Sequence, residues 1–363
     1  MKVLILTCSY GEGHNSVSKA IEEELKERNI SVQILDTSIW GNKFYSKIKL
    51  GLHANAAIKT PKLLNAIYKI GLFISNDKVK SPVYMKNAMS ANSLKDYILE
   101  HEFDVVVSTH LFSMQTLSYL INRGFKIKSY GVITDYCYIP FIEETNLDYY
   151  FIPHKSLIKD FQRKGLPKRK LLGFGIPLKM NIREELSISE AKKRLNIKTD
   201  KKIITIMLGG LGCGDVLSIC KNILQNSDYY VIVLAGSNKS LFKELNEKIK
   251  SPNFKVVPFT SKVNEYLTIS DLVISKPGGI SSTEIIYKEK PLILFEAHLG
   301  VEEYNRKFFE KNKLALYCKN KNEINLLIEK VFKNKFKFNF KYINKKSSQD
   351  IVDFVIKDYK KKD

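Results

Sequence analysis

Short apolar runs alternate along the chain with segments of helical spacing, and this alternation occurs twice. In the first half the β-branched, apolar runs are Val3–Thr7, Val32–Asp36, Asp104–Ser108, Ser129–Thr134 and Asp148–Ile152. The second half starts again with Ile203–Leu208, Tyr230–Leu234, Lys255–Pro258, Leu272–Ser275 and Leu292–Phe295. Such runs predict buried strands, and strands that alternate with helices predict parallel sheets covered by helices. The pattern therefore predicts an α/β protein with two Rossmann-like, doubly wound domains that face each other across a cleft.

Two further signals divide the chain. The clearest helix is Ser16–Arg28, in which Ala20, Ile21 and Leu25 share one face. Between the two halves lies the Gly/Pro-rich stretch 173–177, which is typical of a hinge. We therefore expect an N-terminal domain over 1–177, a C-terminal domain over 178–345, and a C-terminal helix over 346–363 that packs back on the N-terminal domain.

Charge is the unusual feature of the composition. The 363 residues carry a formal net charge of +21, which is compatible with nucleic acid, an anionic membrane or a phosphate-bearing substrate as the partner. Ten lysines and one acid, Asp77, fall within 37–95, interleaved with large apolar side chains. This composition predicts a basic, amphipathic segment that lies on a membrane surface. The alternative is a buried apolar face with solvated lysines, although an ordinary solvated face mixes both signs of charge.

Cysteine usage and apolar run lengths point to a cytoplasmic location. The five cysteines are odd in number and include no C-x-x-C pair, which is typical of reduced thiols rather than of disulfides or a zinc site. The chain has no apolar run long enough to span a bilayer. We therefore expect a cytoplasmic protein that is peripheral on the inner face of the cell membrane.

A first candidate site follows the first predicted strand. Gly11 and Gly13 allow the backbone to approach a ligand, and His14 lies near the start of the following helix. The helix dipole there favours the neutral imidazole, which is able to accept a proton. The alternative is that His14 is a partly exposed residue at a helix start. The loops Thr109-His110 and Thr134-Asp135-Tyr136 end two later strands and would face the same cleft.

Two glycine-rich loops and a third loop with paired carboxylates follow strands of the second half. The first contains Gly209, Gly210, Gly212 and Gly214, whose backbone N–H groups would suit a phosphate. The second runs from Lys276, Pro277, Gly278 and Gly279 to Ser281 and Glu284. Glu284 would accept hydrogen bonds from a ribose, but Ser281-x-x-Glu284 also fits a capping box that needs no ligand. In the third, Glu302 and Asn305 would hold sugar hydroxyls, or Glu302 would only complement a helix dipole.

These loops, in this order, resemble the family of monogalactosyl- and glucosyl-diacylglycerol synthases. The similarity covers most of the chain and is weakest over 37–95 and after Lys319. The transferase that forms lipid II is a more distant match. The resemblance implies a glycosyltransferase-B fold, a UDP-sugar donor in the C-terminal domain and a lipid acceptor on the N-terminal domain. This sequence departs from the family pattern at two points. Val301 replaces a Gln that is expected near the donor sugar, and two glycines precede His14 where the family usually has three.

The resemblance also implies a mechanism and assigns the candidate residues. An inverting transfer of a hexose to diacylglycerol or a related membrane glycolipid needs a base, for which His14 and Asp135 are the candidates. Gly11, Gly13, His110 and Tyr136 would bind the acceptor, and the glycine-rich loops with Lys276, Glu284, Glu302 and Asn305 would bind the donor. The chain contains no Asp-x-Asp, so we expect no metal and no cofactor besides the UDP-sugar substrate.

Other functions remain open from the sequence. One is transfer to a polyprenyl-linked acceptor, and another is a UDP-sugar epimerase, for which the basic segment has no role. A catalytically inactive lipid-binding protein, or a nucleic-acid-binding protein, belongs to a different class. A nucleic-acid-binding protein would not need paired glycine-rich turns, and the sequence contains no nucleic-acid-recognition motif. Nucleic acid is therefore not expected as a partner.

Overall fold

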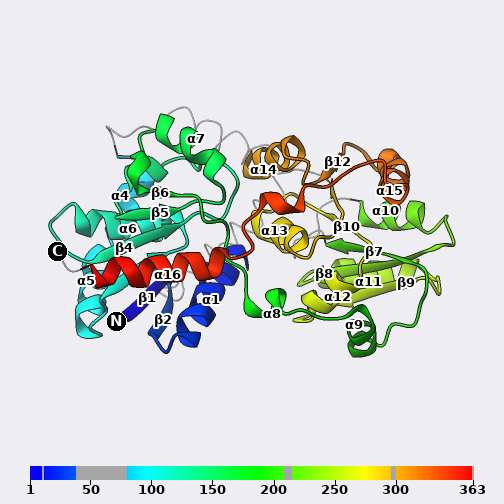
Figure 1. Cartoon of the computed structure of the whole chain (residues 1–363), viewed down its shortest axis with the longest axis horizontal. Helices are drawn as coiled ribbons and strands as arrows, with labels where there is room; N and C mark the ends of the chain where they lie inside the picture. The colour runs from blue at the N-terminus through cyan, green and yellow to red at the C-terminus, as the bar shows by residue number, and fades with distance from the viewer. Residues whose placement is uncertain (10–11, 38–79, 208–214, 296–299, 362–363) are drawn as a thin grey trace. The chain divides into compact units, whose positions relative to one another are not determined.

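The computed structural model describes residues 1–9, 12–37, 80–207, 215–295 and 300–361. Two compact units account for these residues, each with one parallel sheet (Figure 1). The first unit comprises residues 1–180 and 344–363, together with 299–301. The second comprises 181–298 and 302–343. The chain thus passes between the units after Met180, three residues beyond the predicted boundary, and again after Ile343.

The first sheet has six parallel strands in the order β2-β1-β3-β4-β5-β6. Its strands are β1 (Lys2–Thr7), β2 (Ser31–Asp36), β3 (Val105–Ser108), β4 (Lys128–Val132), β5 (Tyr149–Phe151) and β6 (Leu171–Leu172). Its helices are α1 (Glu12–Glu27), α4 (Pro82–Ala88), α5 (Ala91–Glu100), α6 (Leu111–Ile121), α7 (Ile158–Arg163) and α16 (Ser347–Lys360), with short 3-10 turns η2 (Ile142–Glu144), η3 (Lys155–Leu157) and η4 (Lys168–Lys170). The chain order reverses between β1 and β3, where the loops after two adjacent strands diverge to opposite faces.

The second sheet repeats this design in the order β12-β11-β10-β7-β8-β9. Its strands are β7 (Lys202–Met207), β8 (Tyr229–Gly236), β9 (Phe254–Pro258), β10 (Leu272–Ser275), β11 (Leu292–Phe295) and β12 (Leu316–Cys318). Its helices are α8 (Met180–Arg183), α9 (Ile188–Leu195), α10 (Val216–Ile223), α11 (Lys239–Lys248), α12 (Val263–Ile269), α13 (Gly279–Tyr287), α14 (Gly300–Lys311) and α15 (Ile324–Phe332), with the 3-10 turns η5 (Lys321–Glu323) and η6 (Phe340–Tyr342). Here the order reverses between β7 and β10.

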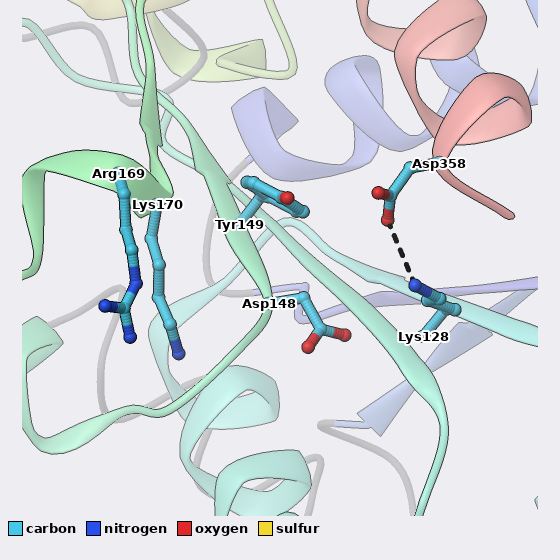
Figure 2. A pocket seen from close by; sticks show the side chains of 6 residues that line it. All are labelled: Lys128, Asp148, Tyr149, Arg169, Lys170 and Asp358. Carbon is cyan, nitrogen blue, oxygen red and sulfur yellow. Dashed lines mark ion pairs between the residues drawn. The ribbon is translucent and has the colours of Figure 1, made fainter. Parts of the chain in front are cut away.

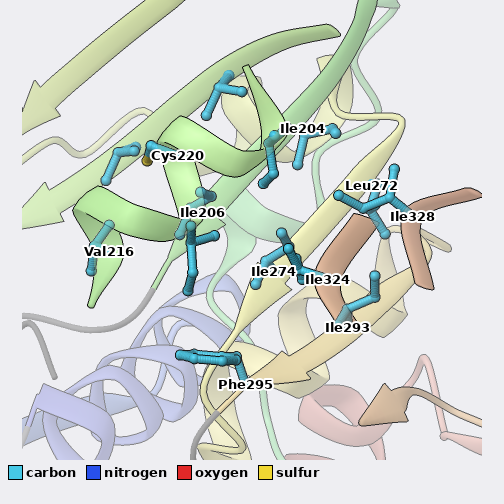
Figure 3. Packing of buried hydrophobic residues seen from close by; sticks show 14 of the residues in the cluster. Ile204, Ile206, Val216, Cys220, Leu272, Ile274, Ile293, Phe295, Ile324 and Ile328 are labelled. Atoms are coloured by element: carbon cyan, nitrogen blue, oxygen red, sulfur yellow. The ribbon is translucent and has the colours of Figure 1, made fainter. Parts of the chain in front are cut away.

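Apolar strand residues form the core of each unit. In the second unit one face of the sheet packs Ile204, Ile206, Leu272, Ile274 and Ile293 against α10 and α15 (Figure 3). Each of these five side chains is fully buried, and burying one contributes about 1.5–3 kcal/mol. A strand that helices cover on both faces is apolar throughout, and this is why these strands were recognisable as apolar runs in the sequence.

The C-terminal helix α16 belongs to the first unit, where it runs beside α1 (Figure 1). Phe354 makes edge contacts with three rings of the sheet, the nearest being Tyr149 at 4.9 Å between ring centroids. Ser347 Oγ donates to the carbonyl of Ile176 at 2.7 Å, close to where the chain first leaves this unit. Gly175 has φ +100°, a conformation that favours glycine, and its backbone lies against Ser347.

The structure refines the sequence expectations at several points. The first helix begins at Glu12 rather than Ser16, so His14 lies inside its first turn. The buried face of Ala20, Ile21 and Leu25 is confirmed. The two-residue strand β6 and the three-residue strand β12 were not predicted, because each is too short to show a pattern. The described cysteines are all buried free thiols, as expected.

Candidate active site

Two histidines meet at the carboxyl edge of the first sheet, beside its point of reversed order. His14 lies in the first turn of α1, which follows β1, and His110 is the N-cap of α6, which follows β3. Because β1 and β3 are hydrogen-bonded neighbours, the two loops lie together. The imidazole centroids are 4.6 Å apart in an edge-to-face arrangement.

The hydrogen bonds of each ring define its tautomer when it is neutral. His14 Nδ1 lies 2.8 Å from the carbonyl oxygen of Thr109. Since a carbonyl oxygen only accepts, Nδ1 carries the proton and the Nε2 lone pair is the one that can accept another. His110 has the opposite arrangement, because its Nδ1 accepts from the backbone N–H of Phe112 at 3.1 Å. His14 is therefore the ring whose Nε2 is the basic nitrogen when the imidazole is neutral.

The surroundings of His14 favour its neutral form. Burial lowers the pKa of His14 below its ordinary value, and the nearby Asp135 carboxylate and the Thr109 carbonyl oppose this shift without reversing it. A base must be unprotonated to act, so a lowered pKa keeps His14 competent at neutral pH. Asp135 is also positioned to stabilise the imidazolium once a proton has been accepted.

The loop that carries Asp135 is held by a buried carboxylate further along it. Glu144 is 1% exposed and accepts a hydrogen bond from Gln115 Nε2 at 2.7 Å and one from Ser81 Oγ at 2.9 Å. Ser81 is the N-cap of α4, and Gln115 lies on the helix that begins at His110. Burial raises the pKa of Glu144. This polar network, which the sequence did not reveal, ties the start of α4 to both candidate-site loops.

The structure brings together only some of the residues predicted for the acceptor side. Gly13 and His110 lie on either side of His14, and Thr134 Oγ1 is 3.4 Å from His14 Nδ1. The Tyr136 side chain is 2% exposed, because it packs inside the unit, so its assignment to the acceptor stays a prediction. Gly11 lies outside the described residues.

A second polar cluster at this edge was missed by sequence reasoning. Asp36, at the end of β2, accepts hydrogen bonds from the Ser9 hydroxyl and, at 3.3 Å, from the Ser9 backbone N–H. Asn15 in turn donates to Ser9 Oγ at 3.2 Å and accepts from Thr7 Oγ1 at 3.0 Å. The sequence signal that could have revealed this cluster was Asp36 itself, an acid at the end of a predicted strand. The cluster fixes the beginning of the loop that leads to His14.

In the second unit the corresponding reversal lies between β7 and β10. The loop after β10 contains Lys276 and Pro277, and α13 begins at Gly279 with Gly278 as its N-cap. The capping-box alternative is wrong, because Ser281 lies inside the helix rather than at its cap and no side chain caps this end. Glu284 is 8% exposed in the following turn. The predicted donor residues Gly209, Gly210, Gly212 and Gly214 lie outside the described residues.

Two side chains of α14 hold this loop. Lys276 Nζ lies 2.9 Å from Glu302 Oε1, and Asn305 Nδ2 donates to the carbonyl of Pro277 at 3.1 Å. Glu302 and Asn305 are 5% and 0% exposed. The structure thus unites Lys276, Pro277, Glu302 and Asn305. Glu302 lies in the first turn of α14, as the helix-dipole interpretation requires, and its carboxylate also pairs with Lys276.

Gly278 is not required by the protein's own packing. Its φ of −75° is available to any residue, and a Cβ at this position would meet no atom within 4 Å among the residues that the structure describes. The open space lies at the N-terminus of α13, where unpaired backbone N–H groups attract anions. A ligand that approaches this backbone closely would account for the glycine.

Phe259 is a further residue that sequence reasoning missed. It follows β9 directly, at the carboxyl edge of the second sheet, and is 74% exposed. A large exposed aromatic ring at the ligand-binding edge of a doubly wound sheet is able to stack on a planar base. Its position immediately after an apolar run was the available signal.

The first unit also contains a cavity of about 280 Å³ (Figure 2), at the opposite edge of its sheet from His14 and His110. It borders the starts of β4 and β5, at the amino edge of the sheet, and is lined by Lys128, Asp148, Tyr149, Arg169, Lys170 and Asp358. Asp358, on α16, lies 3.5 Å from Lys128 Nζ and accepts from the Tyr130 hydroxyl at 2.8 Å. These polar groups dock α16 on the sheet, so the cavity is not the candidate active site.

No helix among the described residues has the length and apolarity needed to cross a membrane.

Two family models match successive parts of the chain. The model of monogalactosyldiacylglycerol (MGDG) synthase matches residues 14–178, and that of the glycosyltransferase family 28 C-terminal domain matches residues 214–357. The first match begins at His14 and includes His110 and Asp135. The second begins at Gly214 and includes the loop after β10 and α14.

Curated relatives match the chain over nearly its whole length. The processive diacylglycerol beta-glucosyltransferase of Bacillus subtilis (strain 168) is 26% identical over 97% of this chain and 93% of the relative. The protein of the same name from Bacillus pumilus (strain SAFR-032) is 26% identical over 98% of this chain and 94% of the relative.

Solved structures share the fold at lower identity. Acinetobacter baumannii MurG superposes with a TM-score of 0.60 and 13% identity, covering 98% of this chain and all of that chain. The UDP-GlcNAc 2-epimerase of Neisseria meningitidis, bound to UDP-GlcNAc, gives 0.64 and 14% with the same coverage. The calicheamicin glycosyltransferase CalG4 gives 0.65 and 10%, covering 99% and 98%. The two-domain glycosyltransferase-B fold is thereby confirmed, but it is shared by transferases and epimerases.

Proposed function

The chain belongs to the family of monogalactosyl- and glucosyl-diacylglycerol synthases, and we propose that it transfers a hexose from a UDP-sugar to diacylglycerol or a related membrane glycolipid. The observation that carries the proposal is the 2.8 Å hydrogen bond from His14 Nδ1 to the Thr109 carbonyl. It presents a basic Nε2 at the ligand-binding edge of the unit that matches the synthase model. A lipid hydroxyl is a weak nucleophile and needs such a base.

The proposed reaction is a single displacement with inversion. His14 Nε2 accepts the proton of the acceptor hydroxyl while that oxygen forms a bond to the anomeric carbon of the sugar. The bond from the anomeric carbon to the diphosphate oxygen breaks, and UDP leaves with the electron pair. Asp135 stabilises the imidazolium that forms, as an acid beside a catalytic histidine does in other enzymes.

The donor is proposed to bind in the second unit, at the N-terminus of α13. The open space beside Gly278 admits the diphosphate to the backbone N–H groups there. The Lys276–Glu302 pair and the Asn305–Pro277 bond hold the loop in place before the donor arrives. Backbone dipoles would then stabilise the charge on the leaving UDP. We accordingly propose that transfer is independent of a metal ion.

Contact with the anionic inner face of the cell membrane completes the proposal. The segment 38–79, which contains most of the lysines of the basic amphipathic region, lies outside the described residues. Immediately after it, α4 exposes Met85 and Met89 to 57% and 86%, with Lys86 exposed between them. Exposed apolar side chains beside lysines favour an interfacial location.

The test is sugar transfer from a panel of radiolabelled UDP-hexoses to vesicles of diacylglycerol and phosphatidylglycerol, with a chelator present. We expect one donor to give a labelled lipid with the wild type, and a loss of about 10²–10⁴-fold for His14→Ala. His101→Ala is the matched control, because His101 caps the end of α5, which leads into the amino end of β3.

Each outcome has a distinct meaning. No labelled lipid with any donor, while UDP still binds, would contradict the diacylglycerol acceptor. Labelling of a polyprenyl-linked acceptor instead would move the function to that substrate. Equal activity of His14→Ala and His101→Ala would remove His14 from the mechanism.

A further inference from the structure

A strip of lysines crosses the surface of the second unit, in a region to which the proposed function gives no role. It consists of Lys330, Lys333, Lys335, Lys337 and Lys341, all of which are exposed. The sequence contains no acid between Lys330 and Ile343. We call these five residues the lysine strip.

Alternating burial holds the lysine strip at the surface. From Lys335 to Tyr342 every second residue is exposed and the residues between them are half-buried aromatics. Phe336 and Phe338 pack against the core of the second unit, with their centroids 4.7 Å apart, and Phe340 stacks on Phe338 at 5.6 Å. Because the aromatic residues anchor the backbone, a ligand that binds these lysines would cost little further backbone entropy.

The charge of the lysine strip is poorly neutralised. Lys333 pairs with Glu329 at 2.8 Å, and Lys330 lies over the Phe336 ring at 5.7 Å. Within the ranges that the structure describes, Lys335, Lys337 and Lys341 form no ion pair with a carboxylate.

Helix α11 of the same unit shows an ordinary surface for comparison. Its lysines alternate with acids along the helix, and Lys248 pairs with Glu244 at 2.8 Å while Lys243 pairs with Glu247 at 3.9 Å. Mixed signs of this kind produce little net field. The lysine strip therefore carries an excess of positive charge that α11 does not.

We propose that the lysine strip binds an anionic lipid bilayer, so that the donor-binding unit contacts the membrane through a surface of its own. The inference rests on the proposed function, because a lipid acceptor places the substrate in a bilayer. Leu326 supports it: this side chain is 68% exposed and lies four residues before Lys330 on α15, so an apolar group accompanies the charges. A single-stranded nucleic acid would instead need outward-facing aromatic rings for stacking, and here the rings face the core.

The expected strength follows from the charge count. Each lysine close to an anionic leaflet strengthens binding about fivefold at low ionic strength. Four such lysines would together strengthen membrane binding several hundred-fold as an upper bound. The gain is smaller at physiological ionic strength, where the Debye length is about 8–10 Å.

The test is sedimentation of the full chain with vesicles of phosphatidylcholine containing increasing fractions of phosphatidylglycerol. The strip variant is Lys333→Gln, Lys335→Gln, Lys337→Gln and Lys341→Gln in one chain. The matched control carries the same loss of four charges in and beside α11: Lys239→Gln, Lys243→Gln, Lys248→Gln and Lys250→Gln. We expect the strip variant to lose at least tenfold in partitioning to anionic vesicles and the control to stay within about twofold.

A second assay separates this inference from the proposed function. Transfer to a short-chain diacylglycerol in neutral detergent should be unchanged in the strip variant, because the lysine strip contains no candidate-site residue. Absence of transfer by the wild type in that assay would contradict the proposed function. Equal losses of vesicle binding in both variants, or no loss in either, would overturn the role of the lysine strip. So would random-sequence RNA displacing the wild type from the vesicles at physiological salt.

Discussion

The ion pair between Lys276 and Glu302 makes an asymmetric prediction. The Glu302 side chain is 6% exposed, whereas that of Lys276 is 29% exposed. Lys276→Met would remove a 2.9 Å cationic partner from a buried carboxylate. Glu302→Gln would leave an ammonium group that can turn toward water. We therefore expect the lysine substitution to be the more damaging of the two.

The distance and the exposures set the magnitude. At the 2.9 Å separation and an effective dielectric constant of about 20, the Coulomb energy of the pair is roughly 6 kcal/mol before desolvation. Removing one partner of a fully buried pair costs about 3–5 kcal/mol. Because Lys276 is partly solvated, we expect Lys276→Met to cost about 2–3 kcal/mol and Glu302→Gln about 1 kcal/mol. The double variant should cost less than the sum of the two.

The assay is urea denaturation of the full chain, with hydrogen exchange of β10 and β11 reporting on the second unit. UDP affinity, measured by calorimetry, should fall for Lys276→Met, since the loop before α13 loses its link to α14. A larger stability loss for Glu302→Gln than for Lys276→Met would refute the reasoning. The reasoning would also be refuted if the stability loss of the double variant equalled the sum of the losses of the two single variants.

Four more results are expected. Activity should require neutral His14, so the acid limb of kcat against pH should have its midpoint below the ordinary value of 6.5; a midpoint above it would contradict the burial argument. Burial raises the pKa of Glu144, so ionisation opposes folding, and wild-type stability should fall as pH rises from the unfolded pKa through the folded one. Denaturation at a series of pH values should show this slope, and Glu144→Gln should remove it. Phe354→Ala should cost about 3 kcal/mol in thermal unfolding, because its ring contacts three rings of the first sheet. The same change at Phe340, whose ring stacks on Phe338, should cost less. Gly278→Ala should leave stability unchanged, since its Cβ meets no atom of the described part of the chain, and should raise KM for the UDP-sugar. An unchanged KM would contradict donor binding in the space beside Gly278.

Much of the fold was predictable because its signals are local. The runs Leu272–Ser275 and Leu292–Phe295 are strands with the predicted bounds, since a strand covered on both faces is apolar throughout. The glycine turns also indicated which strand ends would carry ligand-binding loops, and that part stays a prediction. The order of the loop motifs, rather than the charge, carried the resemblance to the family.

The candidate site was predictable only as a set of separate loops. The sequence placed His14 near the start of a helix, but its partner Thr109 is 95 positions away. The strand order that makes β1 and β3 neighbours is what brings the two together. The tautomer of His14, and therefore its basic nitrogen, depends on that neighbour.

The sequence alone thus determined the kinds of element, their order and the residues capable of chemistry, because helix, strand and turn preferences act over a few residues. The tertiary structure decided which of these residues touch. It rejected the capping box at Ser281 by starting α13 at Gly279, and it paired Lys276 with Glu302 across 26 positions. It also joined Ser81, Gln115 and Glu144 in one buried network. These contacts depend on strand order and burial, which are properties of the packed chain and not of any local stretch of it.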